Sequence, residues 1–273
     1  MSVVAEQMTC VADAERILTR LDEIESYWNG RAASFSAEVR GEMNRGLLAA
    51  WEYVFSKEIA ALGRPQDLAA LDLGCGPGFF SILLAQMGCR VDAMDLSAAM
   101  LEQAQRNAED AGFDGRIVFH QGDVSRTCFA DNSFDLIVLR NVTWLMQDPV
   151  VAYREWHRIL APGGRLLVFD ANWYRYLADR AVDEQRLHDQ ADPSILLRTD
   201  DMNPTLEQEA SCERIAAHLP MTYLDRPSWD LSMLPLIGYA SVEADEDVWQ
   251  TVWPQDEKEF YRSSPMFMIK ATK

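Results

Sequence analysis

Short apolar runs alternate with amphipathic stretches of helical length through the middle of the chain. The apolar runs end in acidic or small residues, as buried strands do, and they cover Ala69–Leu73, Val91–Met94, Ile117–His120, Leu136–Leu139 and Arg165–Phe169. The stretches between them carry apolar residues three or four positions apart, which predicts helices over Phe79–Met87, Ala98–Ala111 and Val150–Leu160. Strands that alternate with helices favour right-handed βαβ units, and therefore an α/β fold with a parallel sheet covered on both faces.

The pattern changes on both sides of this region. Upstream, apolar spacing predicts a helix over Asp13–Tyr27 and then one long or two short helices along a ridge from Phe35 to Ile59. Downstream, Ala171–Arg226 breaks the alternation and is typical of an insertion, with helical patterns near Ala178–His188 and Leu206–His218. A helix near Trp229–Ile237 and strands near Ala240–Glu243 and Pro265–Ala271 are expected to follow. These changes predict four segments: 1–64, 65–170, 171–226 and 227–273.

Charge and composition exclude several functions. The 273 residues contain 25 Lys and Arg against 43 Asp and Glu, a formal net charge of −18, which argues against nucleic acid and anionic lipid as partners. The five cysteines are widely spaced, and no cluster has metal-ligand spacing, so neither a disulfide framework nor a metal is expected. No apolar run has membrane-spanning length and no basic leader is seen, so we expect a cytoplasmic protein whose oligomeric state is open.

A glycine-rich turn follows the first predicted strand. Asp72 lies in that strand, and Gly74, Gly76 and Gly78 follow at every second position. Glycine lets the chain adopt positive φ and lets a ligand approach the backbone where a Cβ would intrude. The dinucleotide fingerprint G-x-G-x-x-G would place its third small residue at Phe79, which does not fit. A pyrophosphate cradle is therefore disfavoured.

An acidic residue ends the second predicted strand. There, the carboxylate of Asp95 can accept both hydroxyl protons of a ribose. Either feature alone is weak, because a glycine-rich turn can be a plain loop and a strand-end Asp is often a helix N-cap. Together they indicate an adenosine ligand without a pyrophosphate.

With this turn and this strand-end Asp, the chain resembles the class I S-adenosylmethionine-dependent methyltransferases, particularly the small-molecule group that includes the ubiquinone and menaquinone C-methyltransferases. The resemblance covers Ala69–Asp170 closely and the last strand more loosely. It implies a doubly wound, mostly parallel seven-stranded sheet with N-terminal helices, a helical insertion after the fifth strand, and S-adenosylmethionine as cofactor. It assigns cofactor contacts to the first two strand ends, at Asp72, Gly74, Cys75, Gly76, Gly78, Asp95 and Leu96.

Further motifs extend the resemblance along the core. Gly122-Asp123-Val124 matches the loop after the third strand, where the family's Asp faces the adenine amino group and its Val the ring edge. The match to the fourth strand implies that Arg140 and Asn141 meet the methionine half of the cofactor.

Upstream, Tyr27–Phe35 resembles a segment that folds over the cofactor in many small-molecule relatives. The resemblance implies that Arg31 pairs with the methionine carboxylate and that Tyr27 closes over the sulfonium. The alternative is a surface helix end whose aromatic residues pack on the core.

Fewer sequence motifs identify residues that would bind the methyl acceptor than identify residues that would bind the cofactor. Many relatives carry His residues after the fourth strand, whereas this chain has Trp144 in that stretch, which we expect to contact the acceptor. The Asn-Pro-Pro-Tyr type of motif is absent. The insertion begins at the active edge of the sheet, so Trp173, Tyr174 and Tyr176 are expected to wall a pocket for a small, partly apolar or cationic acceptor. Alternatively, these residues only anchor the insertion. Tyr174 and His188 are weak candidates for acid or base catalysis.

Three functions remain open from the sequence. The first is methyl transfer to a small molecule by in-line displacement, in which the protein mainly aligns the acceptor and excludes water. The second is a cofactor-binding protein of this fold that acts as a regulatory or scaffold partner. The third, a nicotinamide oxidoreductase, is disfavoured by the glycine spacing.

Overall fold

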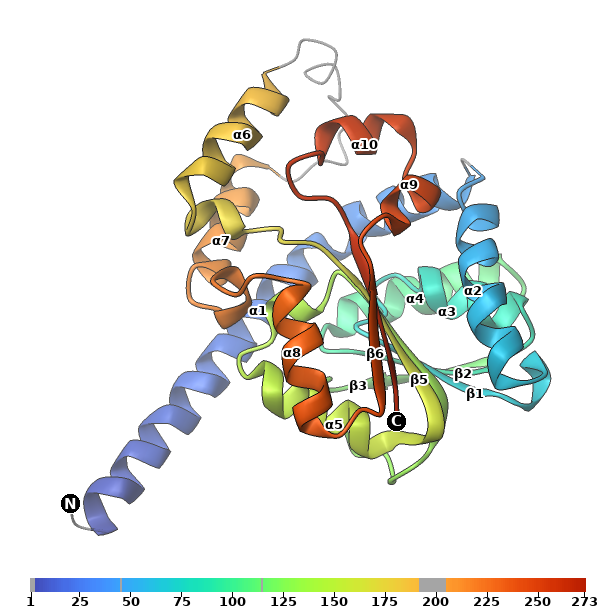
Figure 1. Ribbon diagram of the computed structural model, residues 1–273, viewed down its shortest axis with the longest axis horizontal. Coiled ribbons are helices and arrows are strands. Elements are labelled where there is room, and N and C mark those ends of the chain that lie inside the picture. Colours follow the sequence, from blue (N-terminus) through green and yellow to red (C-terminus); the bar gives the residue numbers. More distant parts are fainter. Residues whose placement is uncertain (1–2, 45, 114, 192–204) are drawn as a thin grey trace.

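The computed structural model describes residues 3–44, 46–113, 115–191 and 205–273, with side chains from Arg20 onward except at 44 and 190. A seven-stranded sheet in the order β3-β2-β1-β4-β5-β7-β6 forms its centre (Figure 1). The strands are β1 (Ala69–Leu73), β2 (Arg90–Asp95), β3 (Ile117–Gln121), β4 (Phe134–Arg140), β5 (Leu160–Asp170), β6 (Ser241–Asp245) and β7 (Phe267–Thr272).

The first five strands run parallel, and only β7 pairs antiparallel, with β5 on one side and β6 on the other. The strand order reverses between β1 and β4, so the carboxyl ends of β1, β2 and β4 flank the crevice where open α/β sheets bind ligands. The expected doubly wound, mostly parallel sheet is confirmed.

Helices cover both faces of the sheet, and each face has its own apolar core. In Figure 1, α2, α3 and α4 lie on one side, α5 and α8 lie on the other, and α6, α7, α9 and α10 gather beyond one end of the strands. The helices are α1 (Val3–Asn44), α2 (Leu48–Leu62), α3 (Phe79–Gln86), α4 (Ala98–Asp110), α5 (Pro149–Ile159), α6 (Arg180–Gln190), α7 (Leu206–Ala216), α8 (Ser228–Ile237), α9 (Val248–Val252) and α10 (Gln255–Phe260). In the part of the chain that the structure describes, each helix is either too short or too polar to span a bilayer.

The N-terminal helices differ from the sequence prediction. Helix α1 continues without a break through Tyr27–Phe35 and past Gly41, where separate helices were expected, and the chain turns only before α2. Glycine in a helix costs about 1 kcal/mol relative to alanine. Packing of α1 against α4 and α7 outweighs this local cost. The segment expected to fold over the cofactor is therefore the middle of a long helix.

A buried ion cluster joins the two ends of the insertion. The Arg226 guanidinium donates to Asp230 at 2.7 Å and to Tyr153 Oη at 3.2 Å, and it lies 3.3 Å from Asp170. Asp170 is the last residue of β5 and also accepts hydrogen bonds from Thr143 and from Trp173 Nε1. Because Asp170 precedes the insertion and Arg226 ends it, this cluster fixes both attachment points beside the sheet edge.

Candidate active site

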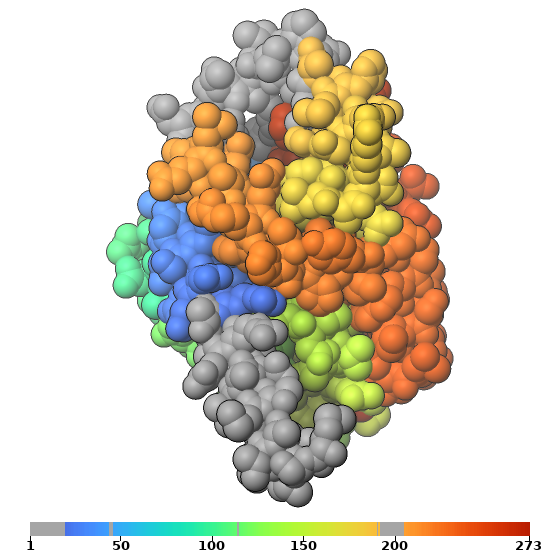
Figure 2. Space-filling model, turned by 90° about the vertical axis from the view of Figure 1, so that its left-hand side faces the viewer, coloured from blue at the N-terminus to red at the C-terminus, as the bar shows by residue number. Residues whose placement is uncertain are grey.

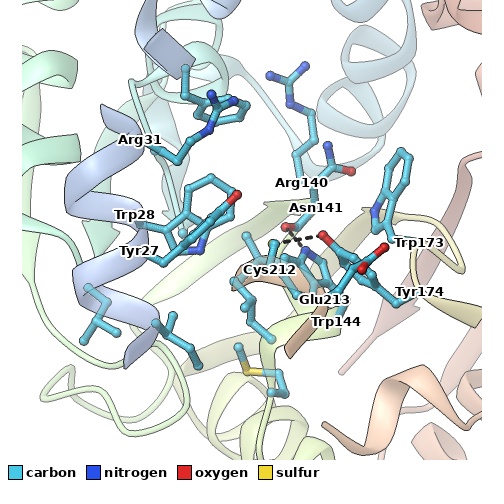
Figure 3. Close-up of a pocket in the computed structure, with 18 of the residues that line it drawn as sticks. Tyr27, Trp28, Arg31, Arg140, Asn141, Trp144, Trp173, Tyr174, Cys212 and Glu213 are labelled. Carbon is cyan, nitrogen blue, oxygen red and sulfur yellow. Dashed lines mark hydrogen bonds between the residues drawn. The ribbon is translucent and has the colours of Figure 1, made fainter. Parts of the chain in front are cut away.

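A cavity of about 520 Å³ opens at the carboxyl ends of the parallel strands. Its floor consists of residues that end or follow β1 to β4, among them Gly74, Asp95, Asp123 and Asn141. Helix α1 and the insertion provide the other walls; Figure 2 shows the orange segment that contains α7 between the blue α1 and the yellow α6. Arg31 and Asn141, expected on the cofactor side, and Tyr174, expected on the acceptor side, therefore line the same cavity (Figure 3).

The turn at the floor of the cavity needs glycine because of its backbone conformation and, at Gly74 and Gly78, because of close neighbours. Gly74, Gly76 and Gly78 all have positive φ. A Cβ on Gly74 would lie 2.4 Å from Val142 Cγ2, and one on Gly78 would lie 3.2 Å from Ala104 Cβ. Gly74 and Gly76 line the cavity directly, whereas Gly78 packs beneath it.

Asp95 is held at the tip of β2 by backbone amides. The Gly76 N–H donates to its Oδ2 at 2.8 Å and the Ser97 N–H donates to its Oδ1 at 2.9 Å. Burial raises the pKa of Asp95 to about 6, against the opposing effect of these amides. A carboxylate fixed in this way faces the cavity with acceptor capacity left for hydroxyl groups.

Two predicted contact residues lie behind the cavity wall. Asp72 is buried and accepts a hydrogen bond from Ser81 at 2.6 Å, and burial raises its pKa to about 7. Cys75 is also buried. Neither residue lines the cavity.

The loop after β3 contributes Asp123 and Val124 to the lining. Asp123 Oδ1 accepts from the Ser125 N–H at 2.8 Å, which orients the side chain. Gly122 lies behind this wall, with Met94 near the position that a Cβ would take.

One face of α1 lines the cavity. Tyr27, Arg31, Phe35 and Glu38 are three or four residues apart, so they lie along the same side of the helix. The buried Arg31 donates to Glu38 Oε1 at 2.8 Å. Burial and the neighbouring Cys212 raise the pKa of Tyr27, so its phenol stays protonated at neutral pH.

At the end of β4, Arg140 and Asn141 enter the lining. The Arg140 guanidinium pairs with Glu42 of α1 at 2.7 Å and lies 4.4 Å from the centre of the Phe79 ring. Asn141 has a φ of 59°, a conformation found disproportionately at functional sites. Its side-chain oxygen is buried without a hydrogen-bond partner among the described residues, so it has unused capacity to accept a donor.

Aromatic side chains form the opposite half of the cavity. Trp144 and Tyr174 pack with ring centres 4.7 Å apart, and the Tyr174 hydroxyl donates to Cys212 Sγ at 2.9 Å (Figure 3). Trp173 also lines the cavity, but its indole N–H donates to Asp170 at 2.8 Å. Trp173 therefore combines the two expected roles, as a pocket wall and as an anchor of the insertion.

The two weak catalytic candidates, His188 and Tyr174, differ in their position relative to the cavity. His188 is exposed on α6 and does not line the cavity. Arg186 on the same helix does, and two residues of an α-helix span about 200°, so His188 points away. Tyr174 lies in the cavity, but burial raises its pKa well above 10. Its hydroxyl is thus a hydrogen-bond donor at neutral pH, and neither residue is placed as a base.

Some lining residues were not found from the sequence. Glu38 continues the four-residue spacing from Tyr27 and could have been found from it. Cys212 and Glu213 lie on an ordinary amphipathic helix that carries no motif. Ser264 lies just before β7, whose antiparallel direction brings its beginning to the carboxyl edge of the other strands. Among the described residues, no group of His, Cys, Asp and Glu is arranged to hold a metal ion.

Comparisons with known proteins find methyltransferases. Residues 71–168 match the family model of the methyltransferase domain. A malonyl-[acyl-carrier protein] O-methyltransferase from Erwinia billingiae is 38% identical over 105 residues, 38% of this chain and 39% of the relative. A ubiquinone/menaquinone biosynthesis C-methyltransferase from Klebsiella pneumoniae is 35% identical over 136 residues, 47% of this chain and 51% of the relative. The chain thus spans about half or less of the length of these relatives.

Solved structures agree at the level of the fold. An S-adenosylmethionine-dependent methyltransferase from Mesorhizobium loti is 22% identical with a TM-score of 0.51, and the match covers 78% of this chain and 94% of that one. A phosphoethanolamine N-methyltransferase from Haemonchus contortus in complex with S-adenosyl-L-methionine is 14% identical with a TM-score of 0.50, covering 83% of this chain and 56% of that one. Residues 71–168 are therefore similar in sequence to a methyltransferase domain, and the chain shares its fold with solved S-adenosylmethionine-dependent methyltransferases.

Proposed function

We propose that this chain transfers the methyl group of S-adenosylmethionine to a small-molecule acceptor bound in the same cavity. The observation that carries the proposal is the continuity of the cavity, which runs from the glycine-rich turn and Asp95 to the aromatic half around Trp144 and Tyr174. A donor and an acceptor must share one enclosed space for direct transfer. A regulatory or scaffold protein needs no second half of this kind.

The residues at the strand ends fit the cofactor. Asp95 would accept the ribose hydroxyls, and Asp123 with Val124 would meet the adenine. The unpartnered Asn141 oxygen would accept from the methionine ammonium. Arg31 would face the methionine carboxylate, and its guanidinium would then pair with both this carboxylate and Glu38. In this proposal residues 1–64 and 171–226 act as covers over the core.

The chemistry needs little from the chain. The bound cofactor supplies a methyl group already activated on a sulfonium. The hydroxyls of Tyr27 and Tyr174 and the thiol of Cys212 all have raised pKa values, because each is buried, so none is ionised at neutral pH. These groups can orient an acceptor by donating hydrogen bonds, and the aromatic walls exclude water.

Asp95→Asn is expected to weaken S-adenosylmethionine binding about tenfold or more at pH 7.5, because a charge-assisted contact is worth about 1.5–3 kcal/mol. The ribose hydroxyls favour the ionised carboxylate, whose pKa is about 6 without ligand. Wild-type affinity should therefore fall as the pH drops through 6, and the variant should lose this dependence. Calorimetry over pH 5–8 measures both, with the exposed Asp110→Asn as the control. Unchanged affinity in a folded Asp95→Asn chain would remove Asp95 from the site.

Tyr174→Ala is expected to reduce turnover of the acceptor at least tenfold while cofactor affinity stays within a few-fold, because Tyr174 lies on the acceptor side. Turnover is measured as S-adenosylhomocysteine formed on a panel of metabolites, which also tests the proposed function itself. Tyr53→Ala, on the exposed face of α2, is the matched control. Cofactor binding without turnover of any acceptor would favour the scaffold alternative, and an equal loss of turnover and of cofactor affinity in Tyr174→Ala would make Tyr174 structural.

A further inference from the structure

The acceptor half of the cavity is walled by aromatic rings on several sides. Tyr27 comes from α1, Trp144 follows β4, and Tyr174 and Tyr176 come from the start of the insertion. In Figure 3 the labelled Tyr27 and Tyr174 lie on opposite sides of the open space. Ring faces carry partial negative charge and attract cations, and this effect is strongest where water is excluded. Such walls accept an apolar body and also favour a positive group.

Two carboxylates lie on the same side of this half. Glu209 and Glu213 are four residues apart on α7, so both face the cavity, and both line it. The Tyr176 hydroxyl donates to Glu213 Oε1 at 2.7 Å, which fixes one oxygen of that carboxylate and leaves the other. The carboxylate of Glu209 makes no ion pair or hydrogen bond with any residue that the structure describes.

The cationic side chains of the lining are already engaged by carboxylates of the protein. Each lies within 3 Å of its partner: Arg31 with Glu38, Arg140 with Glu42, and Arg186 with Asp183. Arg186 also lies over the Tyr176 ring, 4.1 Å from its centre. An anionic acceptor would have to compete with these pairs, whereas a cation meets Glu209 and Glu213 directly.

We propose that the acceptor carries an ammonium group on a small aromatic or otherwise apolar body, an inference that rests on the proposed methyl transfer. Glu213 and Glu209 hold the ammonium, and the rings of Tyr174 and Trp144 hold the body. The net charge of −18 acts in the same direction, because it concentrates cations and repels anions around the molecule.

Three probes of matched shape test this inference: phenethylamine, 2-phenylethanol and 3-phenylpropionate. Each is titrated by calorimetry into the chain saturated with S-adenosylhomocysteine. We expect phenethylamine to bind at least tenfold more tightly than the alcohol, and the acid to bind most weakly. Glu213→Gln should reduce the affinity for the amine about tenfold and leave that for the alcohol unchanged. Glu207→Gln, an exposed position on the same helix outside the cavity, is the matched control and should change neither.

The outcomes separate this inference from the proposed function. If S-adenosylhomocysteine does not bind, the proposed function fails and this inference fails with it. If it binds and the three probes bind equally or not at all, the ammonium inference alone is overturned. An amine preference that survives in both Glu213→Gln and Glu209→Gln would also overturn it, because another group would then recognise the charge.

Discussion

Arg226→Met is expected to lower the free energy of unfolding by about 3–5 kcal/mol, the usual cost of removing one partner from a buried ion pair. Arg226 is 3% exposed, while Asp170 and Asp230 are fully buried. Without the guanidinium, two carboxylates remain in the interior with no cation beside them. Chemical denaturation at pH 7.5 measures the loss.

The control for this variant is an exposed arginine. Arg180→Met removes a solvent-exposed ion pair with Glu184 and should cost at most about 1 kcal/mol. A loss as small as that of Arg180→Met would contradict the view that this cluster fixes the insertion to the sheet.

Gly74→Ala is expected to lower the free energy of unfolding by about 2–5 kcal/mol and to weaken cofactor binding. Alanine at positive φ costs about 1–2 kcal/mol. The contact with Val142 Cγ2 at 2.4 Å adds an overpacking cost of about 1–3 kcal/mol. Denaturation and calorimetry with S-adenosylmethionine measure the two consequences.

Two further variants separate the strain from the clash. Gly163 also has positive φ, 78°, but nothing lies within 4 Å of the position of its Cβ, so Gly163→Ala should show the backbone cost alone. Adding Val142→Ala to Gly74→Ala should restore part of the loss by removing the clashing methyl groups. If Gly74→Ala and Gly163→Ala cost the same, close packing under the turn is not what requires glycine there.

The sequence predicted the core well because its signals are local. A buried parallel strand such as Leu136–Leu139 is a short apolar run between polar residues, and that pattern does not depend on distant parts of the chain. The extent of α1 could not be predicted in this way. Gly30 and Gly41 are poor helix residues, and what keeps the helix continuous is packing against α4 and α7, which lie far along the sequence.

Some residues of the candidate site could likewise be predicted from local sequence, and others could not. Asp95 and Gly74 could be identified because an acidic residue at a strand end and glycines in a tight turn are recognisable sequence patterns. Asp72 was expected as a contact but lies behind the wall, because side chains alternate between the two faces of a strand and its own is directed to Ser81. Glu213 belongs to no recognisable sequence pattern, because only the packing of α7 over the sheet edge brings it to the cavity.

Calorimetric titration of S-adenosylmethionine into the purified chain tests whether the cavity binds this cofactor. We expect one binding site per chain, competition by S-adenosylhomocysteine, no competition by NADH, and an affinity at least tenfold weaker in Asp95→Asn. No binding at millimolar S-adenosylmethionine, or binding that NADH displaces, would contradict this expectation.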